Sequence, residues 1–380
     1  MVATSCLPWA SGHLRTRSFP RCPSLDHGSM VPLCMDQSVH PSVSSRADCI
    51  KLLPECRMSS LTLVVIADPA APFLKALSRL PQDVGVIVSN DLEELKRSAP
   101  QADAILFADV DGNLLAAVLP LAQRVRWIHC LWTGVVEGIL GPELLDHPAL
   151  LTNGRGVFRW PLADWVMAAM LFFAFDLWRV IQQQQQGVWK PFVGTTLDGR
   201  TLGIVGYGAI GSAAAARARP FGMKIAAMRR RPELFHGDSL VDQNYGSEHL
   251  KELMTASDYV LVVTPLTPET RGLIGEPEIA AMKPSAVIMN VGRGPVIDET
   301  ALIRALESGS IRGAAMDVFN TEPLPPDHPF WRMSNVLLSP HTADRVEGFL
   351  DPAFDCFFQN LTRFRKGVPL LNLVDKHAGY

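Results

Sequence analysis

The sequence lacks the cysteine pattern of a metal centre or of a disulfide framework. None of its seven cysteines forms a CxxC pair, and five of them lie within the first 56 residues. Such spacing indicates neither a zinc site nor a set of structural disulfides. We therefore predict that the protein holds no metal.

Long apolar runs and an excess of charge are also missing. The longest apolar run, residues 165–175, covers about half the length that a membrane-spanning helix needs, so we interpret it as a buried helix. A formal net charge of −3 gives no chain-wide attraction to nucleic acid or to an anionic membrane. We expect neither as a partner, and three adjacent arginines at positions 229–231 are a local feature.

Residues 1–57 differ in composition from the rest of the chain. Serine, arginine, proline and cysteine are frequent there, and the first 25 residues contain Arg15, Arg17 and Arg21 but no acid. One interpretation is an organelle transit segment, with the protein in a chloroplast or mitochondrion. The other is a disordered or untranslated leader before a start at Met58, with the protein in the cytoplasm. On either interpretation we expect no chemistry from this extension.

From Leu61 onward, apolar runs rich in β-branched residues alternate with helical patterns. A first series of strands is expected at 61–66, 84–88, 104–108, 125–130 and 149–152. A second series is expected at 201–206, 224–228, 259–263, 286–291, 313–318 and 335–339. Strands that alternate with helices form parallel sheets. The sequence thus predicts an α/β protein with two Rossmann-like units, joined by a long helix that begins near Pro161.

The second series opens with the glycine-rich stretch GYGAIG at residues 206–211, directly after a strand pattern and directly before a helical one. In that order the motif is typical of a dinucleotide site. Gly206 permits the tight turn, Gly208 leaves room for a pyrophosphate, and Gly211 lets the helix pack against the strand. Ala209 and Ile210 open the helix, whose free N–H groups attract phosphate. A nicotinamide dinucleotide is the expected cofactor.

No acid stands at the end of the second strand, where one would bind the ribose 2′-OH of NAD. Arg229 and Arg230 occupy that place, and the first acid is Glu233, beyond the arginines. A guanidinium binds phosphate bidentately, so these arginines favour the 2′-phosphate of NADP, with NAD as the alternative. Arg231 is equally well explained as a surface residue.

Five ordered blocks resemble the D-isomer-specific 2-hydroxyacid dehydrogenase family, which includes glyoxylate and hydroxypyruvate reductases and phosphoglycerate dehydrogenase. They are TLGIVGYGAIG (201–211), TPLTPETRGLIG (264–275), MNVGRGPVIDETAL (289–302), AAMDVFNTEPLPPDHPFW (314–331) and NVLLSPHTA (335–343). The resemblance implies a dinucleotide-binding domain (161–344) inserted into a discontinuous, flavodoxin-like substrate domain (58–160 and 345–380). It also implies a homodimer.

The resemblance assigns catalysis to Arg293, Glu322 and His341. Chemistry supports the same three, because reducing a 2-keto acid needs a cation for the substrate and a proton donor for the developing alkoxide. A carboxylate beside the histidine favours the imidazolium and orients it, a task for Glu322. Asp344 places a second acid near the proton donor and could alter its pKa.

The resemblance also assigns binding roles. Residues that line the cofactor are Pro265, Val291 and Asp317, the last of which contacts the nicotinamide carboxamide. Backbone N–H groups that hold the substrate carboxylate belong to Thr133, Gly134 and Val135. The predicted function is NAD(P)H-dependent reduction of a small 2-keto acid, glyoxylate or hydroxypyruvate, to the D-2-hydroxy acid. The alternatives are oxidation with NAD, as in phosphoglycerate dehydrogenase, and a non-enzymatic, nucleotide-sensing protein like the family's corepressors.

Overall fold

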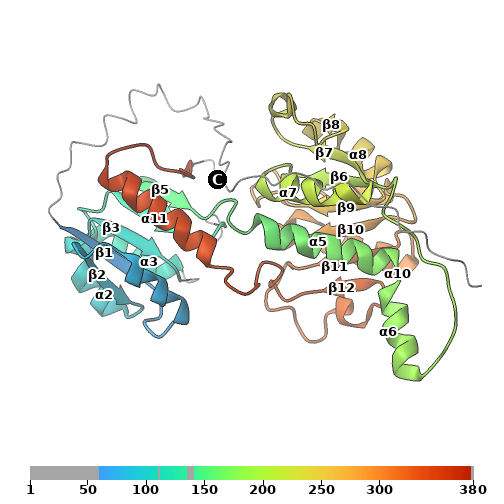
Figure 1. The fold of residues 1–380 in the computed structure, drawn as a ribbon, viewed down its shortest axis with the longest axis horizontal. Coiled ribbons are helices and arrows are strands. Elements are labelled where there is room, and N and C mark those ends of the chain that lie inside the picture. The colour runs from blue at the N-terminus through green and yellow to red at the C-terminus, as the bar shows by residue number, and fades with distance from the viewer. Residues whose placement is uncertain (1–59, 110–111, 135–140, 378–380) are drawn as a thin grey trace, which may run out of the picture. The chain divides into compact units, whose positions relative to one another are not determined.

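The computed structural model describes residues 60–109, 112–134 and 141–377, and these form two parallel β-sheets with helices on their faces (Figure 1). The strands are β1 (Leu61–Ile66), β2 (Val84–Ser89), β3 (Ala104–Phe107), β4 (Trp127–Cys130), β5 (Leu150–Asn153), β6 (Thr201–Val205), β7 (Lys224–Met228), β8 (Gln243–Tyr245), β9 (Tyr259–Val262), β10 (Val287–Asn290), β11 (Gly313–Met316) and β12 (Val336–Leu338). The helices are α2 (Leu92–Ser98), α3 (Gly112–Val118), α4 (Pro142–Asp146), α5 (Arg159–Ala174), α6 (Leu177–Gln186), α7 (Ala209–Ala218), α8 (Leu250–Ala256), α9 (Glu276–Ala280), α10 (Glu299–Ser308) and α11 (Asp351–Arg365). The predicted α/β class with two parallel units is confirmed.

The first sheet has five strands in the order β2-β1-β3-β4-β5. Phenylalanines of α11 cover one face, where the ring of Phe357 stacks on Trp127 with centroids 5.5 Å apart. Helices α2 and α3 cover the other face. Beyond α11, Leu373 pairs with Thr152, and the Val374 N–H donates to the Leu151 carbonyl. The C-terminal segment therefore completes the core of a sheet formed by the N-terminal strands (Figure 1).

The second sheet has seven strands in the order β12-β11-β10-β9-β6-β7-β8. Helices α5 and α7 lie together on one face, and α8, α9 and α10 cover the other. The strand order reverses at the β6–β9 pair, since β7 and β8 extend to one side and β10 to β12 to the other. Open α/β sheets bind ligands at such a switch point, at the carboxyl ends of the strands.

The apolar run at 165–175 forms most of α5, as expected for a buried helix. Eight residues of α5 are buried, among them Val166, Met170 and Phe173. The glutamine run at 182–186 ends α6, and Gly187 stops that helix in the left-handed conformation with φ +63°. Among the described residues, no helix is both long and apolar enough to cross a bilayer.

Strand β8 was not predicted. Its residues, Gln243–Tyr245, include no apolar run, and only Tyr245 is buried. Because β8 is the edge strand beyond β7, it needs little apolar surface to pair. The hydrophobic pattern therefore gives no signal for it.

Candidate functional site

Predicted site residues follow the carboxyl ends of successive strands. In the second sheet they come directly or shortly after β6, β7, β9, β10, β11 and β12. Because these strands are parallel neighbours, their carboxyl ends meet along one edge of the sheet. In the first sheet, Thr133 and Gly134 lie shortly after β4, whereas Val135 lies outside the described residues.

The glycine-rich turn has the geometry that its sequence predicts. Gly206 has φ +104°, and a Cβ there would lie 2.9 Å from the Thr264 nitrogen, so only glycine fits. A Cβ on Gly211 would lie 2.9 Å from the Gly206 oxygen, which explains the close helix–strand packing. A Cβ on Gly208 would meet no atom within 4 Å, so space is open beside its backbone. Ala209 and Ile210 begin α7, and its first N–H groups face this turn.

The arginines after β7 differ in their surroundings. Arg229 is half-buried, donates to the Leu234 carbonyl at 3.1 Å, and lies over the Phe235 ring at 5.3 Å from its centroid. Arg230 is exposed, and Arg231 is half-buried. The guanidinium of Arg229 is thus held in place by its neighbours before any ligand binds.

An acid lies closer to the glycine turn than the sequence suggested. The pKa of the buried Tyr207 is raised, first by burial and then by the charge of Asp238. Arg229 acts on the same hydroxyl in the opposite direction. Asp238 and Arg229 therefore both lie close enough to the Tyr207 hydroxyl to act on its pKa, with opposite sign.

The two loops that follow β9 and β10 contribute backbone more than side chain. Pro265 is exposed, and its carbonyl accepts a hydrogen bond from the Thr270 hydroxyl at 2.7 Å. The Val291 side chain is buried in the core, which leaves its backbone for any cofactor contact. Thr264, which touches the space beside Gly206, has a buried Oγ1 that finds no partner among the described residues.

Arg293 is held by the residues around it. The buried Asn290 side chain accepts from the Gly292 N–H at 2.9 Å and donates to the Arg293 carbonyl at 3.0 Å. The Arg293 guanidinium donates to the Gly292 carbonyl at 2.8 Å. A Cβ on Gly134 would lie 1.8 Å from an Arg293 nitrogen, so this guanidinium lies directly against the Gly134 backbone. The structure therefore brings Arg293 and Gly134 together.

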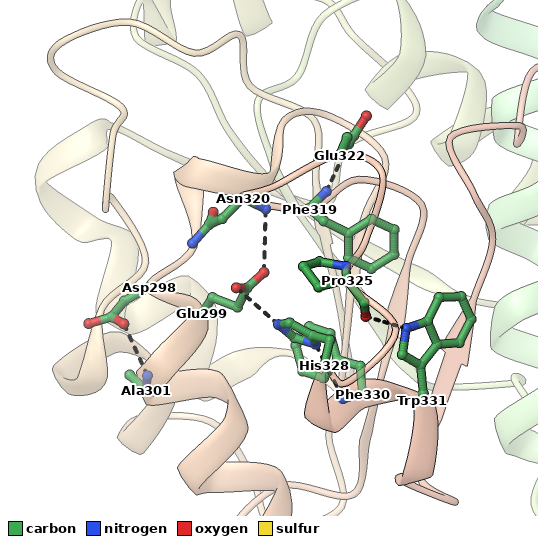
Figure 2. A network of polar contacts seen from close by, with 10 residues as sticks. All are labelled: Asp298, Glu299, Ala301, Phe319, Asn320, Glu322, Pro325, His328, Phe330 and Trp331. Carbon is green, nitrogen blue, oxygen red and sulfur yellow. Dashed lines mark hydrogen bonds and ion pairs between the residues drawn. The ribbon is translucent and has the colours of Figure 1, made fainter.

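The loop of Arg293 also touches the loop that carries Glu322. A Cβ on Gly294 would lie 2.0 Å from the Phe319 carbonyl carbon, so the two backbones are in direct contact. The Phe319 N–H donates to Glu322 Oε1 at 2.9 Å, as Figure 2 shows. The backbone at Phe319 thus links the surroundings of Arg293 and Glu322.

Glu322 and His341 form an ion pair, with Glu322 Oε2 2.7 Å from His341 Nδ1. Through this hydrogen bond Glu322 raises the pKa of His341, although partial burial opposes the shift. Partial burial would raise the pKa of Glu322, but the hydrogen bonds from His341 and from the Phe319 N–H outweigh it and lower that pKa. Both shifts favour an imidazolium beside a carboxylate.

Asp317 organises the segment that contains His341. It is buried, and its Oδ1 accepts from the Ser339 hydroxyl at 2.6 Å and from the N–H groups of Thr342 and Ala343 at 2.9 and 3.1 Å. Its carbonyl accepts from the His341 N–H at 2.9 Å. Oδ1 of Asp317 therefore has a structural role, because its hydrogen bonds are all to this segment. Within the segment, His341 has φ +53°.

Asp344 was expected to disturb the proton donor. Burial raises the pKa of Asp344 itself, and the charge of His341 is the smallest of the influences on it. The charges that act on the pKa of His341 come from Glu322, Arg293 and Asp317. The pKa of His341 is thus set chiefly by Glu322.

Thr133 is fixed by its own polar groups. Its hydroxyl donates to the Gly154 carbonyl at 3.1 Å, and its carbonyl accepts from the Asn153 side chain at 2.9 Å. These bonds orient the backbone that leads to Gly134. Because its hydroxyl and carbonyl are already hydrogen-bonded, Thr133 would bind substrate through its backbone N–H, the group that the family resemblance implies.

Three residues near the site were missed by the sequence analysis. Asn290 fixes the Arg293 loop, Gly294 permits contact with Phe319, and Thr264 holds an unpartnered hydroxyl beside the glycine turn. The second glycine of the GRG stretch could have drawn attention to Gly294. Nothing in the sequence distinguishes Asn290 or Thr264 from other polar residues at strand ends.

The geometry supports proton transfer next to a fixed cation. An imidazolium paired with a carboxylate can donate a proton, and a guanidinium can neutralise a carboxylate or polarise a carbonyl. The glycine turn and the start of α7 can accept a pyrophosphate.

Comparison with known proteins agrees with this arrangement. A family profile described as "D-isomer specific 2-hydroxyacid dehydrogenase, NAD binding domain" matches residues 167–343. The chain is 36% identical over 274 residues to the glyoxylate reductase of Korarchaeum cryptofilum (strain OPF8), covering 69% of this chain and 80% of that relative. It is 33% identical over 301 residues to glyoxylate/hydroxypyruvate reductase B of Shigella boydii serotype 4 (strain Sb227), covering 76% and 92%.

A solved structure shares the fold. The D-isomer specific 2-hydroxyacid dehydrogenase of Xanthobacter autotrophicus Py2, in complex with NADPH and MES, matches with a TM-score of 0.72 and 28% identity, covering 84% of this chain and 100% of that chain. Together, the matched domain and these relatives show that the chain belongs to the D-isomer specific 2-hydroxyacid dehydrogenase family and is an oxidoreductase that uses a nicotinamide dinucleotide.

Proposed function

We propose that the protein reduces a small 2-keto acid, glyoxylate or hydroxypyruvate, to the D-2-hydroxy acid with NADPH. The observation that carries this proposal is the His341–Glu322 pair, 2.7 Å apart, in a site that also contains Arg293. The names of the relatives, a glyoxylate reductase and a glyoxylate/hydroxypyruvate reductase, support this substrate class.

His341 is the proton donor in this mechanism. Its Nδ1 is hydrogen-bonded to Glu322, so the other ring nitrogen is left to protonate the oxygen of the developing alkoxide. Glu322 keeps the ring charged before the reaction and orients it. The cofactor, when bound, supplies the hydride to the carbonyl carbon.

Arg293 binds and polarises the substrate. Its permanent charge neutralises the carboxylate and stabilises the negative charge that develops on the carbonyl oxygen. The N–H groups of Thr133 and Gly134 would hold the same carboxylate, together with that of Val135, which lies outside the described residues. Contact between Arg293 and the Gly134 backbone supports this joint role.

The residues present fit a dinucleotide. Gly208 leaves space beside its backbone for the pyrophosphate, and the buried Thr264 hydroxyl offers a hydrogen bond beside Gly206. Ala209, Ile210 and Gly211 belong to the same phosphate-binding helix start. The backbones of Pro265 and Val291 would line the cofactor, and the second carboxylate oxygen of Asp317 would bind the nicotinamide carboxamide.

Arg229 and Arg230 bind the 2′-phosphate and thereby favour NADPH over NADH. Support comes from the fixed guanidinium of Arg229, which already rests on Phe235 and Leu234. The related Xanthobacter enzyme was solved with NADPH.

The domain division belongs to the same proposal. Residues 58–160 and 345–380 would form the substrate domain and residues 161–344 the dinucleotide domain, with 1–57 outside both. Packing of α11 on the first sheet supports the discontinuous substrate domain. Homodimerisation is a prediction from the family resemblance. A location in an organelle or in the cytoplasm is predicted from the two interpretations of residues 1–57.

The test is a panel of initial rates with glyoxylate, hydroxypyruvate and phenylpyruvate, each with NADPH and with NADH. We expect keto-acid-dependent oxidation of NADPH, with glyoxylate or hydroxypyruvate preferred. A protein that binds NADPH but oxidises it with none of these acids would be a nucleotide sensor instead. Activity confined to 3-phosphoglycerate and NAD would indicate a phosphoglycerate dehydrogenase.

A further inference from the structure

We propose that Glu299 and His328 are positioning residues for this reaction, because together they hold the backbone at Phe319 and Asn320 that places both Glu322 and Arg293. This inference rests on the proposed function. Neither residue was singled out by the sequence analysis, and they act through the loop and not on the substrate.

Glu299 connects two parts of the loop that follows β11. Its Oε2 accepts a hydrogen bond from the Asn320 N–H at 3.4 Å, and its Oε1 lies 3.3 Å from His328 Nε2 (Figure 2). The side chains are only 18% and 13% exposed, so solvent weakens the pair less than it weakens a surface ion pair. Glu299 thus holds this loop at both of its ends.

The position of Glu299 is fixed by the helix that it begins. Glu299 is the first residue of α10, and the preceding Asp298 caps that helix by accepting from the Ala301 N–H at 3.0 Å. A carboxylate at a helix N-terminus is stabilised by the helix dipole. The backbone of Glu299 is therefore fixed independently of the loop that it holds.

His328 is fixed by a different set of contacts. Its Nδ1 accepts from the Phe330 N–H at 3.3 Å, so Nε2 carries the ring hydrogen and donates to Glu299. The ring packs 4.7 Å from that of Phe330, which is buried. Nearby, the Trp331 indole N–H donates to the Pro325 carbonyl at 2.8 Å. His328 is therefore held rigidly where it donates to Glu299.

The backbone at Phe319 and Asn320 connects Glu299 to the catalytic residues. Asn320 receives the bond from Glu299, and the preceding N–H of Phe319 donates to Glu322 at 2.9 Å. Gly294, next to Arg293, packs against the same two residues. A shift of this backbone would therefore displace the carboxylate that charges His341 and the loop that carries Arg293. Misplacement of about 1 Å in a catalytic site can lower the rate about 100-fold.

The experiment compares Glu299→Ala, the isosteric Glu299→Gln and His328→Ala with wild type. The control is Glu276→Ala, because Glu276 is likewise the first residue of a helix but pairs with Arg304 at the surface. We measure kcat for keto-acid reduction against pH, the KM for NADPH, and the melting temperature.

We expect Glu299→Ala and His328→Ala to lower kcat about 5- to 50-fold while the KM for NADPH stays within about twofold. The pH at which kcat falls on the alkaline side should move to lower pH, because a displaced Glu322 no longer raises the pKa of His341. The other charged groups acting on that histidine, Arg293 and Asp317, are unchanged in these variants, as is the neighbouring Asp344. Glu299→Gln, which keeps the shape and one acceptor, should recover part of kcat, and Glu276→Ala should match wild type.

Variants with a lower melting temperature but wild-type kcat and a wild-type pH profile would overturn the positioning role. If His341→Gln nevertheless abolishes activity, the proposed function remains supported. A His341→Gln variant as active as wild type would contradict the proposed function itself, and the two failures are thus distinguished.

Discussion

At the scale of single residues, the site depends on one charged pair and one separate cation. Glu322 holds a proton on His341, whereas the charge of Arg293 works against that proton. The hydrogen bond that His341 donates to Glu322 is the largest influence, so the net pKa of His341 lies above its ordinary value. Reduction needs the imidazolium, and its rate should fall as pH rises through this pKa.

Glu322→Gln should make that fall begin at lower pH. The substitution removes the negative charge but keeps a group of the same shape, so the pKa of His341 returns towards its ordinary value. We expect kcat at pH 8 to drop at least tenfold, with a smaller loss at pH 6, in a kcat–pH series. Glu307→Gln, an exposed change in α10, serves as control. An unshifted profile for Glu322→Gln would show that Glu322 does not charge His341.

Arg229 and Arg230 allow a second prediction for single residues. Replacing both with alanine should raise the KM for NADPH about 10- to 100-fold, the loss expected for charged hydrogen bonds, and change that for NADH less than threefold. Steady-state kinetics with both cofactors measure this, and Arg304→Ala, a surface arginine paired with Glu276, is the control. Equal effects on the two cofactors would reject the 2′-phosphate assignment.

At the scale of elements, contacts between loops decide the geometry of the site. The parallel strands deliver each loop to one edge of the sheet, but the loops are positioned against one another by close backbone contact. Gly294 is the clearest example. The Arg293 loop and the Phe319 backbone lie so close together there that no Cβ would fit between them. This position tests whether the loop contact matters.

Gly294→Ala should push the two loops apart, because its Cβ would lie 2.0 Å from a backbone carbon. We expect a stability loss of about 1–3 kcal/mol and a kcat at least tenfold lower, with NADPH affinity preserved. Gly85→Ala is the control, since its Cβ would meet only the Leu61 oxygen at 3.8 Å. Chemical unfolding measures the loss of stability, and initial rates measure kcat. Full activity in Gly294→Ala would contradict the role of this contact.

The sequence allowed most of the element order to be predicted, but few of the contacts. Alternating apolar runs identified the strands of both sheets, and the GYGAIG stretch located the turn after β6. Edge strand β8 was missed because it has no apolar run. The pairing of Glu322 with His341 came from family resemblance, and the contacts of Gly294 and Glu299 depend on loop paths that no periodicity encodes.

At the scale of the whole molecule, a buried histidine couples the fold to pH. His129 lies in β4, fully buried, and burial lowers its pKa to about 3. Its Nδ1 lies 2.7 Å from Thr152 Oγ1, which also accepts from the Trp127 indole N–H at 2.8 Å. The ring is therefore neutral when folded and gains a proton only on unfolding.

Because the folded pKa is depressed, this contribution to stability is complete above pH 6.5 and is lost as pH falls towards 3. Between pH 7 and pH 5 the free energy of unfolding should decrease by about 2 kcal/mol through His129 alone. His129→Gln should remove that part of the slope in urea unfolding at pH 7, 6 and 5. His236→Gln, an exposed change, should keep the slope. Identical slopes in wild type and His129→Gln would rule out this coupling.

The central claim, that His341 donates the proton in reduction of a 2-keto acid, is tested most directly in one pair of samples. NADPH binding by fluorescence and NADPH oxidation with glyoxylate and hydroxypyruvate are measured on wild type and on His341→Gln. The account predicts equal NADPH binding and a rate lower by about 100-fold or more in the variant. Equal rates in the two proteins, or a wild type that binds NADPH yet reduces neither acid, would contradict it.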